Sequence, residues 1–469
     1  MSMNEGVQGY RAWSIEQREQ RLQRSGLEVA LTPASRKKLL GISGLYNQQR
    51  ALNEHEHIEL EHANHTYKAG LTQRSHRQRY RILVYNLTVL EIVPLGAGPA
   101  MIAASSNPVS ASLQNEGNSS LTLAPPIEQR GVTKLLQELA VRTLYSLGLD
   151  SGEVLLTDMG SRRYVVEAIT PLLEQPSTTL PEPYRTAAQV LARKLALEQP
   201  GRPGLLMGMD PEFLLLRETS DRVVRASRFL PMAGVAGCDA GPPGTRGAFP
   251  VAELRPEPRG EPRALLAQLM SAVAAADRLI TDRSLRWRAG GMPLRGWALG
   301  GHLHFSGVTL SGPLLRALDN YLALPMLLLE DARAGARRPR YGVLGDFRYQ
   351  PHGGFEYRTL PSFLVSPVVA KGAVYLAHLI VSHYEELPLR PLDREELHAA
   401  YYSGDKPPLR AAFTPLLAQL RALSGYEQAA RYIEPLFHYI AAERTWDESR
   451  DIRELWIQRE PHTISPTHK

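Results

Sequence analysis

Residues 300–307 read GGHLHFSG, and this stretch decides the fold of the second half of the chain. His302 and His304 stand two residues apart, near the end of a segment whose alternating pattern predicts a strand. Successive side chains of a strand point to opposite faces, so the two imidazoles share one face while Leu303 and Phe305 take the other. Flanking glycines keep bulk away, which predicts a strand that a ligand approaches closely.

Three further predicted strands also carry ionisable groups two residues apart. They are LLMGMDPEFLLL with Asp210 and Glu212, FPVAELRPEP with Glu253 and Arg255, and HGGFEYRTLPS with Glu356 and Arg358. One such pair is what any antiparallel sheet with a wet face would give. Here four strands carry such pairs, and every pair consists of carboxylates, imidazoles or guanidinium groups. This favours a shared functional face instead. If the strands are neighbours, one concave face bears at least four carboxylates, two histidines and two arginines.

Such a face has a definite chemistry. Crowded carboxylates repel one another and become protonated unless cations lie between them. An oxygen-rich site with an imidazole favours Mg²⁺ or Mn²⁺ over zinc. Arginine binds phosphoryl oxygens with two parallel hydrogen bonds, so the neighbouring arginines indicate a phosphate. Metal, arginine and phosphate together predict phosphoryl-transfer chemistry.

A nearby glycine-rich segment partly matches a phosphate-binding motif. Residues 241–249 read GPPGTRGAF, which resembles G-x-x-x-x-G-K-[ST]. Arg246, Gly247 and Ala248 stand where that motif needs Gly-Lys-Thr, so its essential lysine is missing. We therefore expect a flexible loop beside the site, not a P-loop.

The composition excludes several classes of protein. The chain has 469 residues, enough for about three domains, and 43% of them are hydrophobic, as in a globular protein. No run of about 18 apolar residues predicts a membrane span, and the N-terminus lacks the apolar core of a signal peptide. The single cysteine, Cys238, excludes a disulfide framework and suits the cytoplasm, where we expect the protein. The net charge of +6 is modest, and no basic-aromatic module indicates a nucleic-acid partner.

Periodicity and proline–glycine linkers divide the chain into five parts. They are a helical N-terminal region (1–77), a small α/β module (78–175), a helical linker (176–204), the catalytic domain (205–388) and a C-terminal helical region (389–469). The small module is expected to contain a strand from 79 to 95 with a turn at Asn86–Leu87, and a long loop over 103–130. Four histidines of the first part could bind a metal, although a solvated helix explains them better: His55, His57, His62 and His65.

The ionisable strands also carry a family resemblance. Residues from about 205 to 385 resemble the carboxylate–amine ligase superfamily that includes glutamine synthetase and glutamate–cysteine ligase. The resemblance rests on five motifs in this order: MDPEF, AELRPEP, GGHLHFSG, RYGVLGDFR and FEYRTLPS. They above all resemble the phage- and Bacillus-type amidoligases, COOH–NH2 ligase type 2. The resemblance implies an α+β fold whose antiparallel sheet curves into a glutamine-synthetase-like funnel with flanking helices. ATP would enter one mouth and the acceptor the other.

The resemblance also implies roles for single residues. Metal ions would be held by Asp210, Glu212, Glu253, His302 and Glu356. Nucleotide phosphates would be contacted by His304, Arg255, Arg340 and Arg348. Glu356 and Arg358 would be the catalytic pair, with Arg358 steadying the transferred phosphoryl group. Whether Asp239 or Glu257 joins the metal shell stays open, and so does the base that deprotonates the amine.

A second resemblance covers about 78–172. RYRILVYNLTVLEIV, LLQELAVRTLYSLGLDSGEVLL and RRYVVEAITP are similar to the C-terminal part of an ATP-grasp domain. The terminal Glu-x-Asn metal pair is incomplete, because Glu167 is present without the asparagine, and Leu155 stands where an aspartate is usual. This resemblance implies a degenerate, structural or substrate-presenting module rather than a nucleotide site.

Together these patterns predict an ATP- and Mg²⁺- (or Mn²⁺-) dependent ligase that forms an amide or peptide bond through an acyl phosphate. Its partners would be small-molecule or peptide carboxylates and amines, with no nucleic acid and no membrane, and the sequence leaves an oligomer open. Two alternatives stay open: a guanidine-kinase-like phosphotransferase, and a non-catalytic binding or coat-associated scaffold on an inherited fold. The scaffold would require a damaged metal set, and the set is complete in the sequence.

Overall fold

The computed structural model describes residues 6–38, 77–95, 127–172, 179–245 and 247–457. The chain forms two compact units, Met1–Ala188 and Gln189–Lys469, and the division falls inside helix α6 (Glu182–Ala196). The predicted histidine cluster at 55–65 lies outside the described residues. No helix of the described residues is both long enough and apolar enough to span a membrane.

The first unit is built on one five-stranded sheet. Its order is β1 (Glu28–Val29), β5 (Tyr164–Pro171), β4 (Ser151–Asp158), β2 (Arg79–Tyr85) and β3 (Thr88–Leu95). Only β1 and β5 run parallel and every other pairing is antiparallel, so this unit is α+β rather than the predicted α/β. The predicted turn at Asn86–Leu87 is confirmed, since both residues have positive φ (42° and 64°) and join β2 to β3.

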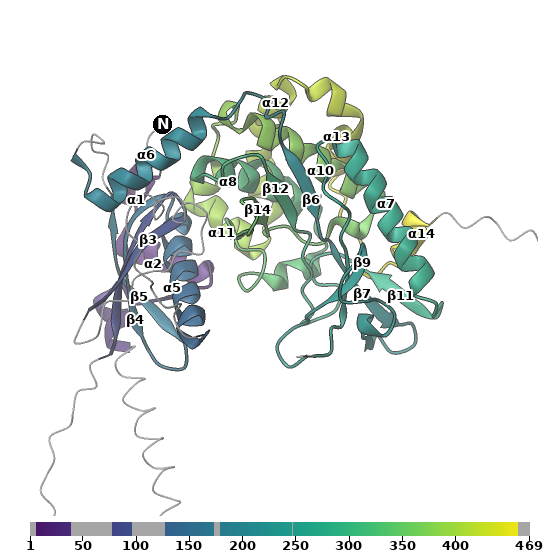
Figure 1. Ribbon diagram of the computed structural model, residues 1–469, viewed down its shortest axis with the longest axis horizontal. Coiled ribbons are helices and arrows are strands. Elements are labelled where there is room, and N and C mark those ends of the chain that lie inside the picture. The colour runs from purple at the N-terminus through teal and green to yellow at the C-terminus, as the bar shows by residue number, and fades with distance from the viewer. Residues whose placement is uncertain (1–5, 39–76, 96–126, 173–178, 246, 458–469) are drawn as a thin grey trace, which may run out of the picture. The chain divides into compact units, whose positions relative to one another are not determined.

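Helices cover one face of this sheet. They are α1 (Val7–Ala12), α2 (Ile15–Arg24) and α5 (Ile127–Ser146), and Figure 1 shows α5 lying along the strands. Ser14 begins α2 with a capping box that Gln17 completes. The predicted loop at 103–130 ends too late, because its last residues already belong to α5. The buried core between helices and sheet includes Ile82, Val84, Leu136, Leu144, Val154, Leu156 and Val166.

The second unit contains two antiparallel sheets. The first is β11 (Leu285–Arg288), β7 (Glu212–Arg217), β10 (Val251–Leu254) and β9 (Ala236–Asp239), with β8 (Val223–Val224) beside β7. The second is β13 (Phe347–Tyr349), β14 (Phe355–Tyr357), β12 (Leu303–Ser306) and β6 (Leu206–Met209). The α+β class is therefore confirmed for this part of the chain, while the funnel curvature stays a prediction.

The prediction of one sheet for all four ionisable strands is wrong. LLMGMDPEFLLL does not form one strand: β6 ends at Met209, β7 begins at Glu212, and the two belong to different sheets. Pro211 explains the break, because proline has no N–H to donate to a strand partner. The chain thus crosses from one sheet to the other at Asp210 and Pro211, and both sheets contribute to the site.

Helices pack around these two sheets. The long ones are α7 (Pro262–Leu279), α10 (Pro367–His383), α12 (Lys406–Ala422) and α13 (Tyr426–Ala441), and the shorter ones are α8 (Gly312–Leu318), α9 (Leu324–Leu329), α11 (Glu395–Ser403) and α14 (Arg453–Trp456). A π-helical turn, η3 (Asp319–Ala323), joins α8 to α9. Short 3-10 helices are η2 (Ala226–Arg228), η4 (Ala332–Arg337), η5 (Phe363–Val365), η6 (Tyr384–Glu386) and η7 (Pro391–Asp393). Helices α10 and α13 pack against each other, and the C-terminal helices belong to the same unit as both sheets.

Candidate active site

Asp210 lies at the crossing between the two sheets and contacts both histidines of the opening motif. Its Oδ1 is 3.1 Å from Nδ1 of His302, and its Oδ2 is 3.1 Å from Nε2 of His304. One carboxylate can meet both imidazoles because residues two apart in an extended chain share a face. The backbone holds this arrangement, since the N–H of Asp210 donates to the carbonyl of His302.

The glycines of GGHLHFSG have separate roles. A Cβ on Gly300 would lie 2.2 Å from Nε2 of His302, so any side chain there would displace the imidazole. Gly301 and Gly307 do not open the site to a ligand as expected. A Cβ on Gly301 would lie 2.3 Å from the carbonyl oxygen of Pro361, and one on Gly307 2.2 Å from that of Gly204. These two glycines therefore serve close backbone packing, and only Gly300 keeps space at the histidines.

Strand register brings Glu356 to the same place. Glu356 is directly opposite His304 across β12 and β14, and Arg348 is directly opposite Glu356 across β13 and β14. The Glu356 side chain is only 2% exposed. Its carboxylate meets Nδ1 of His302 at 3.3 Å, Nε of Arg358 at 3.0 Å, Nη1 of Arg348 at 3.3 Å and Nε2 of Gln350 at 3.0 Å.

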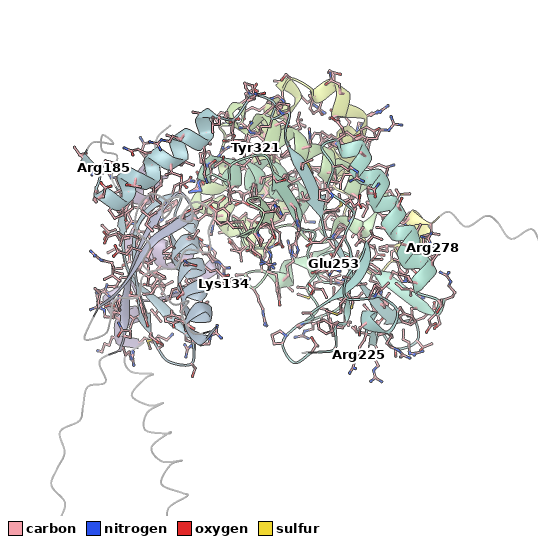
Figure 2. The ribbon with its side chains drawn as sticks, in the orientation of Figure 1. Lys134, Arg185, Arg225, Glu253, Arg278 and Tyr321 are labelled. Carbon is pink, nitrogen blue, oxygen red and sulfur yellow. The ribbon has the colours of Figure 1, made fainter. Side chains whose placement is uncertain are left out.

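Glu212 and Glu253 form the part of the site that lies on the other sheet. They are directly opposite each other across β7 and β10, and Figure 2 shows Glu253 in the middle of the second unit. The Glu212 carboxylate accepts the N–H of Gly300 at 2.7 Å. Glu253 is buried and pairs with Arg255, which also donates to the carbonyl of Met232 at 3.1 Å. Arg255 therefore lies beside a site carboxylate.

The crowding of carboxylates shifts their protonation. Burial raises the pKa of Glu212 to about 7, with His302 and the Gly300 N–H opposing the shift and Asp210 adding to it. Burial and the charge of Asp210 raise the pKa of Glu253 to about 9. Burial alone would raise the pKa of Asp210, but hydrogen bonds from the two histidines lower it below its usual value. Near neutral pH Glu253 is therefore protonated and Glu212 partly so, and a cation that binds these carboxylates would have to displace their protons.

His302 is the protonated partner in this network. Burial alone would lower the pKa of its imidazole, but the hydrogen bond and charge of Asp210 raise that pKa to about 9. A metal ion that binds through His302 must therefore displace a proton. The three side chains that bring ligand atoms within 4.8 Å of one another are Asp210, His304 and Glu356. Two carboxylates and one imidazole suit Mg²⁺ or Mn²⁺. His302 also contacts both carboxylates through Nδ1, at 3.1 Å from Asp210 and 3.3 Å from Glu356, so both histidines lie at this site.

Two of the sequence candidates lie apart from this site. The guanidinium of Arg340 lies over the ring of Tyr341, 5.7 Å from its centroid, and no contact links it to the site among the described residues. Its expected role at the nucleotide therefore has no geometric support. Glu257 is 66% exposed and pairs with Arg259 at 2.7 Å. Asp239, in contrast, ends β9 close enough to raise the pKa of both Glu212 and Glu253.

Sequence reasoning missed two polar residues of the site. Gln350 donates to Glu356, and the hydroxyl of Ser362 donates to the backbone carbonyl of Glu212 at 2.6 Å. Gln350 could have been found from its spacing to Glu356, because that spacing allows a hairpin that brings the two residues together. We find no sequence signal for Ser362.

In the first unit, the Glu167 carboxylate accepts hydrogen bonds from two side chains. Its carboxylate accepts from Nε of Arg79 at 2.9 Å and from the Thr157 hydroxyl at 2.7 Å. Thr157 lies on β4, the neighbour of β5, and Arg79 lies on β2, the next strand of the same sheet. The ATP-grasp resemblance of this unit stays a prediction.

Comparisons with known proteins add to this geometry. A family model described as phage phiEco32-like COOH.NH2 ligase-type 2 matches residues 207–457. No curated protein matches the sequence. Among solved structures, a bifunctional glutathione synthetase from Pasteurella multocida matches with a TM-score of 0.34 and 10% identity, covering 57% of this chain and 51% of its own. Apo GmaS without ligand matches with a TM-score of 0.29 and 14% identity, covering 61% of this chain and 80% of its own. This chain thus spans about half the length of the glutathione synthetase.

Proposed function

This chain belongs to the family of phage phiEco32-like COOH.NH2 ligases of type 2, and on that premise we propose that it uses ATP and Mg²⁺ or Mn²⁺ to join a carboxylate to an amine through an acyl phosphate. One observation carries the proposal. Asp210, His304 and Glu356 offer ligand atoms within 4.8 Å of one another, and two arginines contact the same Glu356 carboxylate. A cation site with arginines at its edge is what phosphoryl transfer between two anions requires.

The reaction has two steps, phosphoryl transfer to the carboxylate and attack by the amine. A carboxylate oxygen attacks the γ-phosphorus of ATP, the bond to the bridging oxygen breaks, and ADP leaves. The amine nitrogen then attacks the acyl carbon, phosphate leaves with the electrons of its bond, and the nitrogen loses a proton. Activation is necessary because a carboxylate offers no leaving group to an amine at neutral pH. A bound divalent cation would supply charge neutralisation between the substrate carboxylate and the phosphates.

The chain's own residues would prepare these steps. Asp210, His304 and Glu356 would hold one cation, and Glu212 with Glu253 would hold a second on the neighbouring sheet. His302 would keep Asp210 and Glu356 in place through its contacts with both. These assignments follow the family resemblance except at the histidines, where His304 would bind the cation and His302 would position the carboxylates.

Arg358 and Arg348 would act on phosphate. Burial alone would lower the pKa of Arg358, but Asp346 and Glu356 raise it, so its guanidinium stays charged beside the carboxylate. The Arg348 side chain is 49% exposed, so it is free to turn toward a phosphate in the solvent-facing part of the site. Arg255, with 32% of its side chain exposed, would reach a substrate from the other sheet.

One experiment tests the proposal. The full chain is incubated with ATP, Mg²⁺ and pooled amino acids, small peptides and polyamines, and products are identified by mass spectrometry. We expect a condensation product together with ADP and phosphate, and we expect the Glu356→Gln variant to form neither. A phosphorylated compound without condensation would establish a phosphotransferase instead. Equal ATP turnover in the Glu356→Gln variant would place the chemistry elsewhere.

A further inference from the structure

A buried carboxylate lies far from the ligase motifs, in the segment that follows α13. Glu448 is 1% exposed. Its carboxylate accepts the N–H of Gly291 at 2.5 Å, the N–H of Met292 at 2.8 Å and the indole N–H of Trp446 at 3.0 Å. Gly290 has a φ of +116°, and a Cβ there would lie 2.4 Å from Cδ of Glu448. The turn at 290–292 is therefore shaped around this carboxylate.

Two short paths connect that turn to the site. The carbonyl of Gly290 accepts the N–H of Ser362 at 3.2 Å, and the hydroxyl of Ser362 donates to the backbone carbonyl of Glu212 at 2.6 Å. The carbonyl of Gly291 accepts the N–H of Leu299 at 3.1 Å. The next residue after Leu299 donates its N–H to the Glu212 carboxylate. Both paths end on Glu212, one at its backbone and one at its side chain.

Hydrogen bonds other than those of Glu448 also hold the C-terminal segment. The Trp446 N–H donates to the carbonyl of Leu329, the Ile452 N–H to that of Trp287, and the Trp456 indole to that of Leu364. An apolar residue could fill the same space without the desolvation penalty that a buried carboxylate brings. A carboxylate is useful here because it binds two successive backbone N–H groups at once. The family match, which extends to residue 457, includes this segment.

We propose that Glu448 is a positioning residue for Glu212: by holding the turn at 290–292, it fixes the backbone and carboxylate of Glu212 in the cation site. The inference rests on the proposed function, since it takes Glu212 as part of that site. Glu448 itself touches neither substrate nor cation. Its removal should loosen Glu212 and so weaken cation binding while the C-terminal segment stays docked.

The test measures Mn²⁺ binding to the full chain by calorimetry, without any turnover assay. We expect Glu448→Ala to weaken Mn²⁺ affinity about tenfold or more, as loss of a group that supports a metal ligand commonly does. Glu448→Gln keeps one acceptor oxygen and should lose less. Glu454→Gln is the matched control, because Glu454 lies in the same segment but is 60% exposed and pairs with Arg450. A folded Glu448→Ala variant that binds Mn²⁺ like the parent overturns the inference, whereas a parent chain that binds no Mn²⁺ overturns the proposed function itself.

A second measurement separates positioning from simple destabilisation. Ser362→Ala removes one link between the turn and Glu212 and leaves Glu448 untouched. If both residues act through the same turn, the losses of affinity in Glu448→Gln and Ser362→Ala should be less than additive in the double variant. Additive losses would overturn the inference. This cycle also decides the matter if Glu448→Ala fails to fold, as judged by its near-ultraviolet circular dichroism.

Discussion

Glu167 in the first unit and Glu356 in the second are both glutamates on a strand beside an arginine, yet their surroundings differ. Glu167 is 28% exposed and pairs with an arginine, Arg79, that is 44% exposed. Glu356 is 2% exposed and meets two arginines, a histidine and a glutamine. A surface pair of the first kind contributes about 0–1 kcal/mol and carries no functional information. Burial with several converging charges, as at Glu356, is what marks a site.

The largest expected difference concerns the arginines of these two pairs. Arg358→Lys should reduce ATP turnover about a thousandfold, because arginine stabilisation of a transferring phosphoryl group is worth roughly 10³ or more and lysine lacks the planar fork. Arg79→Lys, the matched change beside Glu167, should leave turnover within about twofold. Steady-state ADP release measures both. If the two variants lose activity equally, the greater burial of the Arg358–Glu356 pair relative to the Arg79–Glu167 pair has no functional meaning.

A smaller effect is expected at the second carboxylate of the site. Glu212→Ala should weaken Mg·ATP binding about tenfold or more, because the deleted side chain belongs to the proposed cation site. Calorimetric titration with a non-hydrolysable ATP analogue and Mg²⁺ gives the affinity. Unchanged binding in this variant would show that the sheet containing β7 and β10 does not contribute to nucleotide binding.

Ligand binding should also raise thermal stability. At a hundred times its dissociation constant, Mg·ATP contributes about 2.7 kcal/mol to the native state, which corresponds to a rise in Tm of several degrees. The Glu356→Gln variant should show little of this rise, whereas Glu167→Gln should show all of it. Scanning calorimetry with and without Mg·ATP provides the comparison, and a full rise in Glu356→Gln would contradict the cation assignment.

The smallest effect is expected at Glu167 itself. Glu167→Ala should change ATP affinity by less than about threefold, which is under 1 kcal/mol. Its carboxylate is already satisfied by Arg79 and Thr157, and both partners remain able to bind water. Calorimetric titration decides the point. A large loss here, combined with intact binding in Glu212→Ala, would move the nucleotide to the first unit.

Local features of the fold were predictable because they depend on neighbours in the sequence. The shared face of His302 and His304 follows from the two-residue period of a strand, and the Asn86–Leu87 turn from its composition. The separation into two sheets was not predicted, because Pro211 interrupts a strand-like pattern without changing its period. The need for glycine at 301 likewise depends on the closeness of the Pro361 carbonyl, which no local pattern indicates.

Long-range members of the site lie beyond sequence reasoning of this kind. Glu448 is 157 residues from Gly291, and nothing in the sequence distinguishes it from the neighbouring acidic residues Asp447 and Asp451. Arg340 shows the opposite case, since its motif resembles the family while its guanidinium lies over the ring of Tyr341, and its role at the nucleotide stays a prediction. Residue type and spacing can thus place candidates on a face, but only tertiary packing selects those that converge.

The crossing of the chain at Asp210 and Pro211 links ligand binding to cooperativity of unfolding. Asp210 stands between β6 of one sheet and β7 of the other, and its carboxylate contacts the two histidines. An ion bound by Asp210, His304 and Glu356 would hold the crossing residue against the sheet of β12 and β14, and so would couple that sheet to β7, which begins two residues further along the chain. Local opening of either sheet would then require release of the ion, so backbone amides of both sheets should exchange with solvent as one unit in the bound state and separately in its absence.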